Sequence, residues 1–337
     1  DGAFGFKIIP GSSSNDWSSY FGSNFLRCVD DYNEDGFNDI LLGDPSADNG
    51  VGRSLLLFGM GSSWPAVVNV SSLTTSSVLF TSSSSDTMTL GCMAESLDLN
   101  LDGHVDLVIS APNAESQCGH VHVIWGGQIL PLNMSLPVTS TDQGAYFKGS
   151  STQAFFGYAM TTGDINGDNN TDLIVSSPSS SKYVIIVVFA IQNASYLLGQ
   201  TVIPNSITFT DIISSEMFGF SLATGDINGD GFDDVFIGAK DALSGKGRIY
   251  IVFGSASPSP FIIASTSTPD GITWSRINGY SANAQLGFEV GVVHGCLFPK
   301  PLPHDRHPSS TYEHTQHAMH QPRPPQRDSR AEALQVR

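Results

Sequence analysis

Four short acidic segments of this 337-residue chain share one spacing of oxygen-bearing side chains. Each segment is nine residues long and has Asp or Asn at positions 1, 3, 5 and 9, with Gly or Asn at position 6. The segments are Asp31–Asp39, Asp98–Asp106, Asp164–Asp172 and Asp226–Asp234. Clustered carboxylate and amide oxygens are ligands for hard cations, and such a set suits Ca²⁺ better than Zn²⁺ or Mg²⁺. The spacing therefore predicts four calcium-binding loops.

These loops differ from an EF-hand, which needs a bidentate Glu at position 12 between two helices. Here position 12 is Leu42, Ile109, Val175 or Ile237, each in an apolar run typical of a short buried strand. Position 6 must turn sharply, which Gly does freely and Asn tolerates, and position 7 is then placed to offer its backbone carbonyl. The alternative is an Asp/Asn/Gly hairpin turn without an ion, which four copies at matched spacing disfavour.

The loops recur with a period of 67, 66 and then 62 residues, which indicates a repeat architecture with one supersecondary unit per repeat. Each loop follows a Phe-Gly or Leu-Gly pair, and a fifth pair has no loop after it. The pairs are Phe21-Gly22, Leu90-Gly91, Phe156-Gly157, Phe218-Gly219 and Leu286-Gly287. A buried strand, a turn and a second apolar strand follow each loop. The second strands are Ser54–Phe58, Val121–Trp125, Tyr183–Phe189 and Arg248–Phe253, and three of the four end at Gly59, Gly126 or Gly254.

Each unit therefore contains about four short strands joined by tight turns, with no helical periodicity. Because four-stranded antiparallel sheets repeated radially make a β-propeller, the predicted fold class is an all-β propeller of four-stranded antiparallel blades. In this fold the Phe fills space between adjoining blades, and the Gly lets the innermost strand crowd close to the axis. Since each acidic loop joins the innermost strand to the second strand, all four should lie on one rim.

This order of motifs, Phe-Gly, acidic loop, Gly-Ala-Pro-like turn and a strand ending in Gly, resembles the FG-GAP repeats of integrin α-subunits. The resemblance covers residues 1–291 and implies a seven-bladed propeller with Ca²⁺ in the hairpins of its lower face. It implies metal ligation by the side chains at positions 1, 3, 5 and 9 and by the carbonyl at position 7. These residues are Asp31, Asn33, Asp35, Phe37, Asp39, Asp98, Asn100, Asp102, His104, Asp106, Asp164, Asn166, Asp168, Asn170, Asp172, Asp226, Asn228, Asp230, Phe232 and Asp234. The first repeat departs slightly, since nine residues rather than seven separate Gly22 from Asp31, which predicts a bulge in its inner strand.

The repeats predict one propeller domain over residues 1–291, followed by a tail. Four complete units span about 21–80, 90–150, 156–215 and 218–277, and a partial unit spans 278–291. Residues 292–337 are rich in Pro, His and Arg and lack apolar periodicity, which predicts a disordered or aberrant segment. Because residues 4–9 resemble the end of a preceding blade, we expect a fragment of a longer, seven-bladed protein. A five-bladed ring closed by residues 1–20 is the alternative.

Composition and charge narrow the partners and the compartment. The formal net charge of −17 at pH 7 argues against nucleic acid. The longest apolar run, Val184–Ile191, has the length of a strand rather than of a membrane span. Calcium modules of weak affinity belong outside the cell, where calcium is plentiful, and Asn69, Asn133 and Asn193 begin N-glycosylation sequons. We therefore expect about four structural Ca²⁺ ions and an extracellular or cell-surface protein made in the secretory pathway.

The cysteines do not define a disulfide framework. Cys28 is expected to be a buried thiol on an inner strand. Cys92 and Cys118 lie in one unit with a strand between them, which holds them too far apart for easy bridging.

The residues and the resemblance together predict a non-catalytic calcium-binding propeller for protein recognition or cell adhesion. By the integrin resemblance, a protein ligand or partner subunit would bind the face opposite the calcium loops. One alternative is the accessory propeller of a secreted hydrolase, because FG-GAP propellers also occur in glycosylphosphatidylinositol-specific phospholipase D. Another is a structural surface repeat protein. The chain has no G-x-S-x-G or H-E-x-x-H motif, and His104, His120 and His122 are expected to be loop and strand residues rather than catalytic ones.

Overall fold

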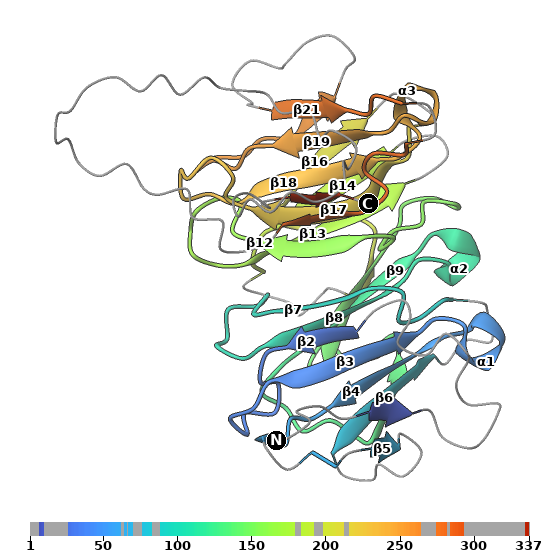
Figure 1. The fold of residues 1–337 in the computed structure, drawn as a ribbon. Coiled ribbons are helices and arrows are strands. Elements are labelled where there is room, and N and C mark those ends of the chain that lie inside the picture. Colours follow the sequence, from blue (N-terminus) through green and yellow to red (C-terminus); the bar gives the residue numbers. More distant parts are fainter. Residues whose placement is uncertain are drawn as a thin grey trace, which may run out of the picture.

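The structure is a computed structural model, and it shows successive small sheets stacked along the chain (Figure 1). It describes residues 7–9, 26–61, 64–65, 67–69, 76–82, 88–178, 183–191, 198–211, 216–263, 274–281, 284–292 and 334–336. Four antiparallel sheets, here called blades 1 to 4, account for most of these residues. This arrangement confirms the predicted all-β fold of four-stranded antiparallel blades.

Each blade takes its four strands from one continuous stretch of chain, and neighbouring strands pair in chain order. Blade 1 contains β2 (Leu26–Val29), β3 (Asp39–Asp44), β4 (Arg53–Leu57) and β6 (Ser77–Ser82). Blade 2 contains β7 (Ala94–Leu97), β8 (Asp106–Ala111), β9 (His120–Ile124) and β11 (Gly144–Lys148). Blade 3 contains β12 (Met160–Gly163), β13 (Asp172–Pro178), β14 (Tyr183–Val188) and β16 (Ser206–Asp211). Blade 4 contains β17 (Phe218–Gly225), β18 (Asp234–Ala239), β19 (Arg248–Val252) and β21 (Trp274–Asn278).

The innermost strands of successive blades contact one another in order, from β2 to β7, β12 and β17 and then to β22 (Val290–Val292). Three left-handed turns, each classed as a four-residue helix, join the second and third strands of blades 1, 2 and 4. They are α1 (Ala47–Gly50), α2 (Ala114–Gln117) and α3 (Ala242–Gly245). All three lie on the same side of the stack (Figure 1).

The hydrophobic core lies between the blades, because the side chains of each middle strand alternate between two buried faces. On β8, Leu107 and Ile109 pack toward blade 1, while Val108 packs toward blade 3. The same alternation on β13 and β18 forms the core between blades 3 and 4, which contains Ile174 and Ile237. Burial on both faces explains why the strand after each acidic loop is apolar without interruption.

Short strands link each blade to the one before it, a feature absent from the sequence prediction. Each lies between the third and fourth strands of its own blade and pairs in parallel with the outermost strand of the preceding blade. The pairs are β10 (Asn133–Leu136) with β6, β15 (Leu198–Gln200) with β11, and β20 (Phe261–Ile263) with β16. In the same way β5 (Val67–Asn69) pairs with β1 (Lys7–Ile9), which agrees with the expectation that residues 4–9 end a preceding blade.

The Phe-Gly pairs join adjoining blades, as predicted, but the Gly acts differently from the expectation. Phe156 is fully buried, and the backbone of the preceding blade approaches it at Gly119, where an added Cβ would lie 2.3 Å from the Phe156 carbonyl oxygen. Gly157 has φ +87° and presses on Ser110 and Val121 of blade 2. The glycine is therefore needed for a left-handed turn against the neighbouring blade, rather than for crowding at the axis.

The remaining expectations concern the two ends of the chain, the inner strand of blade 1 and Cys28. The first Phe-Gly pair and most of segment 292–337 lie outside the described residues. Within that segment, β23 (Leu334–Val336) pairs antiparallel with β22. The inner strand before Asp31 is described from Leu26, and it pairs with β3 without a register shift rather than through a bulge. One extra residue, Asp30, lies between this strand and the loop, because Val29 pairs with Asp39 whereas Leu97, directly before the second loop, pairs with Asp106. Cys28 is exposed rather than buried, because β2 ends the described row of innermost strands and has a neighbour of this kind, β7, on one side only. No helix within the described ranges is long and apolar enough to cross a membrane.

Candidate metal sites on one rim

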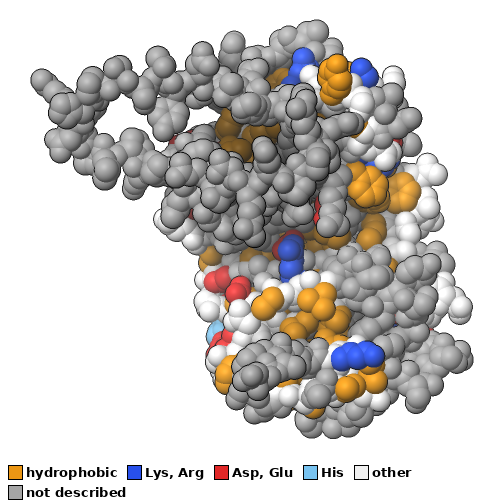
Figure 2. Space-filling view, in the orientation of Figure 1, with side chains coloured by type: hydrophobic (Ala, Val, Ile, Leu, Met, Phe, Trp, Pro, Cys, Tyr) orange, Lys and Arg blue, Asp and Glu red, His pale blue; other side chains and the backbone are white. Residues whose placement is uncertain are grey.

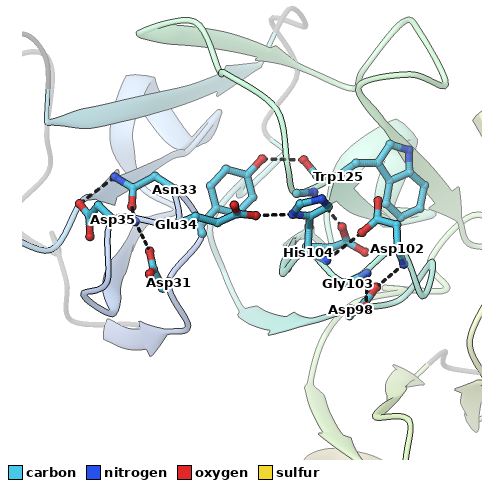
Figure 3. Close-up of polar contacts among 12 residues, drawn as sticks. Asp31, Asn33, Glu34, Asp35, Asp98, Asp102, Gly103, His104 and Trp125 are labelled. Carbon is cyan, nitrogen blue, oxygen red and sulfur yellow. Dashed lines mark hydrogen bonds and ion pairs between the residues drawn. The ribbon is translucent and has the colours of Figure 1, made fainter.

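Each acidic loop joins the innermost strand of a blade to its second strand, as the sequence predicts. Contacts join the first loop to the second and the third to the fourth, and Leu101 of the second loop lines one pocket with Asn166 and Asp168 of the third, so the four lie along one rim. Glu34 of the first loop pairs with His104 of the second, and the two side chains point toward one another in Figure 3. Asp164 of the third loop and Asp233 of the fourth exchange two hydrogen bonds, of 2.9 and 2.8 Å. In Figure 2 acidic side chains and one His side chain show at the left margin, on the side away from α1 and α2 in Figure 1.

The backbone of every loop turns at the predicted position and at one further position. Position 6 has a positive φ in all four loops, between 65° at Asn169 and 93° at Gly36. Position 4 also has a positive φ, at Glu34 (60°), Leu101 (58°), Gly167 and Gly229. Non-glycine residues seldom adopt this conformation, so the side-chain hydrogen bonds of the loop must support it. Sequence reasoning missed the second turn because Glu and Leu give no signal for it.

In each loop the oxygens of positions 1 and 3 converge on one backbone N–H. The Asp35 N–H lies 3.0 Å from Asp31 Oδ1 and 3.2 Å from Asn33 Oδ1. The corresponding distances lie between 2.9 and 3.1 Å in the second, third and fourth loops. The other oxygen of position 1 accepts the N–H of position 6, and position 5 accepts the N–H of position 7. The loops thus hold their oxygens toward a shared centre.

The Asp at position 9 differs from the others because it begins the second strand and is fully buried. Burial raises the pKa of Asp39 and Asp234 to about 6 and that of Asp106 and Asp172 to about 7. Backbone N–H donors oppose this shift, and the carboxylates at positions 1 and 5 add to it. A folded pKa above the ordinary value means that the ionised carboxylate is disfavoured unless a positive charge comes close.

Two backbone N–H groups bind the position-9 carboxylate in three of the loops. One comes from position 2, as in the 2.9 Å bond from Leu99 to Asp106. The other comes from the Gly after the third strand, as in the 2.8 Å bond from Gly126 to Asp106. Asp172 of the third loop has only the first of these bonds, and its buried Oδ1 has no hydrogen-bond partner. An unpaired buried acceptor of this kind costs about 1–3 kcal/mol.

The donor set suits a hard cation, although no finished cluster is present. Across the described ranges, no three His, Cys, Asp or Glu side chains lie together as a metal-binding group. At positions 1, 3, 5 and 9 each loop instead offers three carboxylates and one Asn, and backbone carbonyls add to them; all of these are oxygen donors of the kind that Ca²⁺ prefers. The orphaned Asp172 oxygen fits a bound cation as well. Ligation by the predicted side chains, and by the carbonyls of position 7, stays a prediction.

Three of the loops also bind the next blade through their position 2. The Tyr32 hydroxyl donates to the Trp125 carbonyl at 2.6 Å, between blades 1 and 2. The Leu99 carbonyl accepts the Ile191 N–H at 2.7 Å, between blades 2 and 3. The Ile165 carbonyl accepts the Ser255 N–H at 3.0 Å, between blades 3 and 4. A loop held in shape therefore supports an interface between blades as well as its own hairpin.

Two buried polar clusters near the opposite rim were not predicted. In blade 4 the Tyr250 hydroxyl donates to Glu216 Oε2 at 2.8 Å, and Arg248 Nη1 lies 3.2 Å from the same oxygen. In blade 2 His122 is fully buried, and neither of its ring nitrogens has a hydrogen-bond partner. Burial lowers the pKa of His122 to about 3, so this imidazole is neutral. No chemical motif joins these residues in the sequence.

Comparison with known proteins identifies the repeats. The FG-GAP repeat family matches residues 156–198 and 218–252, and each match begins at a Phe-Gly pair and contains one acidic loop. The chain therefore contains FG-GAP repeats, and the geometry described above extends the same loop to blades 1 and 2. Its propeller blades resemble those of integrin α-subunits, as the motifs predict.

The similar proteins include members of two groups. Integrin alpha-PS2 of Drosophila melanogaster is 35% identical over 123 residues, which are 34% of this chain and 8% of that protein. Integrin alpha-PS5 of the same organism is 34% identical over 113 residues, or 32% of this chain and 11% of that protein. Human phosphatidylinositol-glycan-specific phospholipase D is 32% identical over 184 residues, or 50% of this chain and 21% of that protein. The aligned segments thus span less than a quarter of the length of these relatives.

Proposed function

We propose that the chain is an extracellular, non-catalytic propeller module that binds structural Ca²⁺ in its four acidic loops and recognises a protein partner. The observation that supports calcium most directly is the repeated convergence of the position-1 and position-3 oxygens on the N–H of position 5. This network recurs although the intervening residues differ between loops. A set of converging carboxylate and amide oxygens is the kind of site that binds a hard cation.

The predicted metal ligands would together stabilise the folded state and would take no part in a chemical reaction. The side chains at positions 1, 3 and 5 would hold the ion at the rim, and the buried position-9 Asp would hold it against the second strand. The bound ion supplies the positive charge that the raised pKa values of these Asp residues call for. Because only the folded loop assembles these oxygens, each ion stabilises the fold by linkage, by about 2.7 kcal/mol at a hundredfold excess over Kd.

Calcium titration tests this proposal. We expect isothermal titration calorimetry on chelator-stripped protein to show about four Ca²⁺ ions bound per chain. We also expect calcium to raise Tm by more than about 10 °C over the value in EDTA. Mg²⁺ at equal concentration should give a smaller rise, because it dehydrates reluctantly and demands strict octahedral geometry. An unchanged Tm would overturn the calcium assignment.

Recognition or adhesion is supported by the similarity to the integrin alpha chains of Drosophila melanogaster. A partner would use the rim that bears α1, α2 and α3, away from the ion loops. Immobilised chain is expected to retain cells in calcium better than the same chain denatured by heat. Equal retention by the two would argue against an adhesive role and favour a structural surface repeat protein.

Secretion is proposed from calcium chemistry and from the sequons. Asn133 lies exposed on β10, where an oligosaccharyltransferase has access to it. When the chain is expressed behind a secretory leader, glycosidase treatment should lower its apparent mass, and Asn133→Gln should remove one glycan. Absence of glycan at Asn133 would count against the secretory assignment.

The second candidate is the accessory module of a phospholipase. The human phosphatidylinositol-glycan-specific phospholipase D aligns with half of this chain. We expect this chain alone to release no protein from vesicles that carry a glycosylphosphatidylinositol-anchored reporter. Release above the level of a heat-treated control would overturn the non-catalytic assignment.

A further inference from the structure

The four acidic loops differ at one atom, the Oδ1 of the buried Asp at position 9. In Asp39, Asp106 and Asp234 this oxygen accepts the N–H of Gly59, Gly126 or Gly254 at 2.8, 2.8 and 3.0 Å. In Asp172 it accepts no hydrogen bond, although the residue is as fully buried as the other three. The third loop therefore contains a buried carboxylate oxygen that lacks the glycine N–H bound in the other three loops.

The cause lies in one substitution after the third strand of blade 3. Leu173 pairs with Val188 where Leu107 pairs with Ile124, so Ala190 occupies the place of Gly126. An added Cβ at Gly126 would lie 2.4 Å from the Val105 carbonyl oxygen, and Gly59 and Gly254 are equally tight. Only a glycine can bring its N–H this close to the loop, and Ala190 cannot.

The third loop is also the one most firmly joined to its neighbour. The Asp164 N–H donates to Asp233 Oδ2, and the Asp233 N–H donates to the Asp164 carbonyl. The Phe232 ring covers Gly167, where an added Cβ would lie 2.4 Å from the ring. The shape of this loop therefore decides how blade 3 meets blade 4.

Resting on the calcium binding proposed above, we propose that the four cation sites are unequal. The Asp164–Asp172 loop is the site at which folding depends most on a bound Ca²⁺ ion, and this ion secures blade 4 against blade 3. Asp164, Asp168 and Asp172 place three carboxylates at this loop, and the cation binds the Asp172 oxygen that accepts a glycine N–H in the other loops. In the other loops the backbone already provides part of this compensation.

Matched Asp→Asn variants at position 9 of the full chain test the inequality. In EDTA, Asp106→Asn is expected to lower Tm by about 2–4 °C, because Asn has one acceptor oxygen where the Gly126 and Leu99 N–H groups each bind a separate oxygen of Asp106. In EDTA, Asp172→Asn should leave Tm unchanged or raise it, because it removes a buried charge with an unpaired oxygen. In calcium, Asp172→Asn should lose a larger part of the calcium-dependent rise in Tm than Asp106→Asn. Equal behaviour of the two variants in both conditions would overturn the proposal.

One further variant avoids the ligands altogether. Ala190→Gly is expected to raise Tm in EDTA and to reduce the calcium-dependent rise, because the restored N–H takes part of the role of the ion. Hydrogen exchange of the unsubstituted protein adds a measurement that needs no variant. In EDTA, residues 164–172 should exchange faster than residues 98–106, and calcium should slow them more.

These outcomes separate the two proposals. A wild-type Tm that does not respond to calcium overturns the calcium assignment and the inequality together. A normal calcium response, with Ala190→Gly indistinguishable from the wild type and equal slowing of the two loops, leaves the calcium assignment standing and overturns the inequality.

Discussion

The two rims of the propeller blades repeat in different ways. On the loop rim the side-chain hydrogen bonds recur in every blade, whichever residue stands at position 4. On the rim with α1, α2 and α3 the backbone recurs instead. Leu90, Phe156 and Leu286 each donate their N–H to the preceding blade at 3.0 to 3.1 Å. The polar side-chain contacts there differ between blades, with an Asp48–Arg53 pair in blade 1 and a buried Glu216–Arg248–Tyr250 cluster in blade 4.

This difference distinguishes the structural features needed to stack the blades from those needed to bind a ligand. A repeated backbone path is enough to stack one blade on another. Repeated oxygen side chains are not needed for stacking, and their presence in every loop points to a common bound species. The opposite rim, where each blade has its own side chains, is the part of the molecule able to distinguish one protein partner from another.

The largest effect of a single substitution is expected on the variable rim. Glu216→Gln leaves the Arg248 guanidinium buried without its counter-charge, since both side chains are less than a tenth exposed. Breaking one partner of a buried ion pair costs about 3–5 kcal/mol. Thermal unfolding should show the same loss in calcium and in EDTA.

Asp48→Asn is the matched control for that substitution, because its partner Arg53 is also in a rim pair but is more exposed. The expected loss is about 0–1 kcal/mol. A loss after Glu216→Gln that appears only in calcium would show that the two rims are coupled. That result would contradict the view that the α1–α3 rim contributes to stability independently of the bound ions.

An intermediate effect is expected on the loop rim. Asp102→Asn removes a carboxylate that would ligate the ion and that accepts the His104 N–H. We expect a loss of about 1.5–3 kcal/mol in calcium, and little change in EDTA because Asp102 lies exposed. Chemical denaturation in the two buffers measures the difference. Equal losses in both would mean that Asp102 acts in the turn and not on an ion.

A smaller effect, of opposite sign, is expected in blade 2. Register places His122 in the position that Leu55 occupies in blade 1. His122→Leu removes two ring nitrogens that have no hydrogen-bond partner, so we expect a gain of about 1 kcal/mol at pH 7. The folded pKa of about 3 lies below the ordinary value of 6.5, so the wild type loses stability as pH falls through 6.5 toward 3. The advantage of the variant should therefore grow on acidification, and a constant advantage from pH 7 to pH 5 would contradict the buried, neutral imidazole.

The smallest effect is expected where the first two loops meet. Glu34 and His104 are exposed, and their hydrogen bond raises the pKa of His104. Because water screens such a pair, Glu34→Gln should leave Tm unchanged within error. Loss of calcium affinity at either loop would show that this contact contributes to the sites.

Features that recur as a pattern of residue types, such as the acidic loops, could be predicted from the sequence. Features that recur only as a backbone path, such as the second turn of each loop and the linking strands, could not. Gly or Asn at position 6 signalled the first turn of each loop, but Glu34 and Leu101 gave no sign of the second. The linking strands are three or four residues long and partly polar, too short for an alternating pattern to show. Ala190 was visible as the missing glycine after a third strand, but its effect on Asp172 became clear only when register brought them together.

Long-range polar contacts were equally hidden. Glu216 precedes a Phe-Gly pair and reaches Arg248, which is 32 positions away, only because the blade folds back on itself. The prediction for Cys28 was wrong because a place on an inner strand indicated burial, whereas β2 ends the described row of innermost strands and contacts only β7 among them.

The linking strands have a consequence for association between molecules. An outermost strand normally presents unpaired N–H and C=O groups along which another chain can add. In blades 1, 2 and 3 that edge is already occupied by a strand from the following blade. Of the outermost strands that the structure describes, β21 of blade 4 alone has no such strand beside it. Any tendency of this chain to aggregate by strand addition should therefore concentrate there, at Trp274–Asn278.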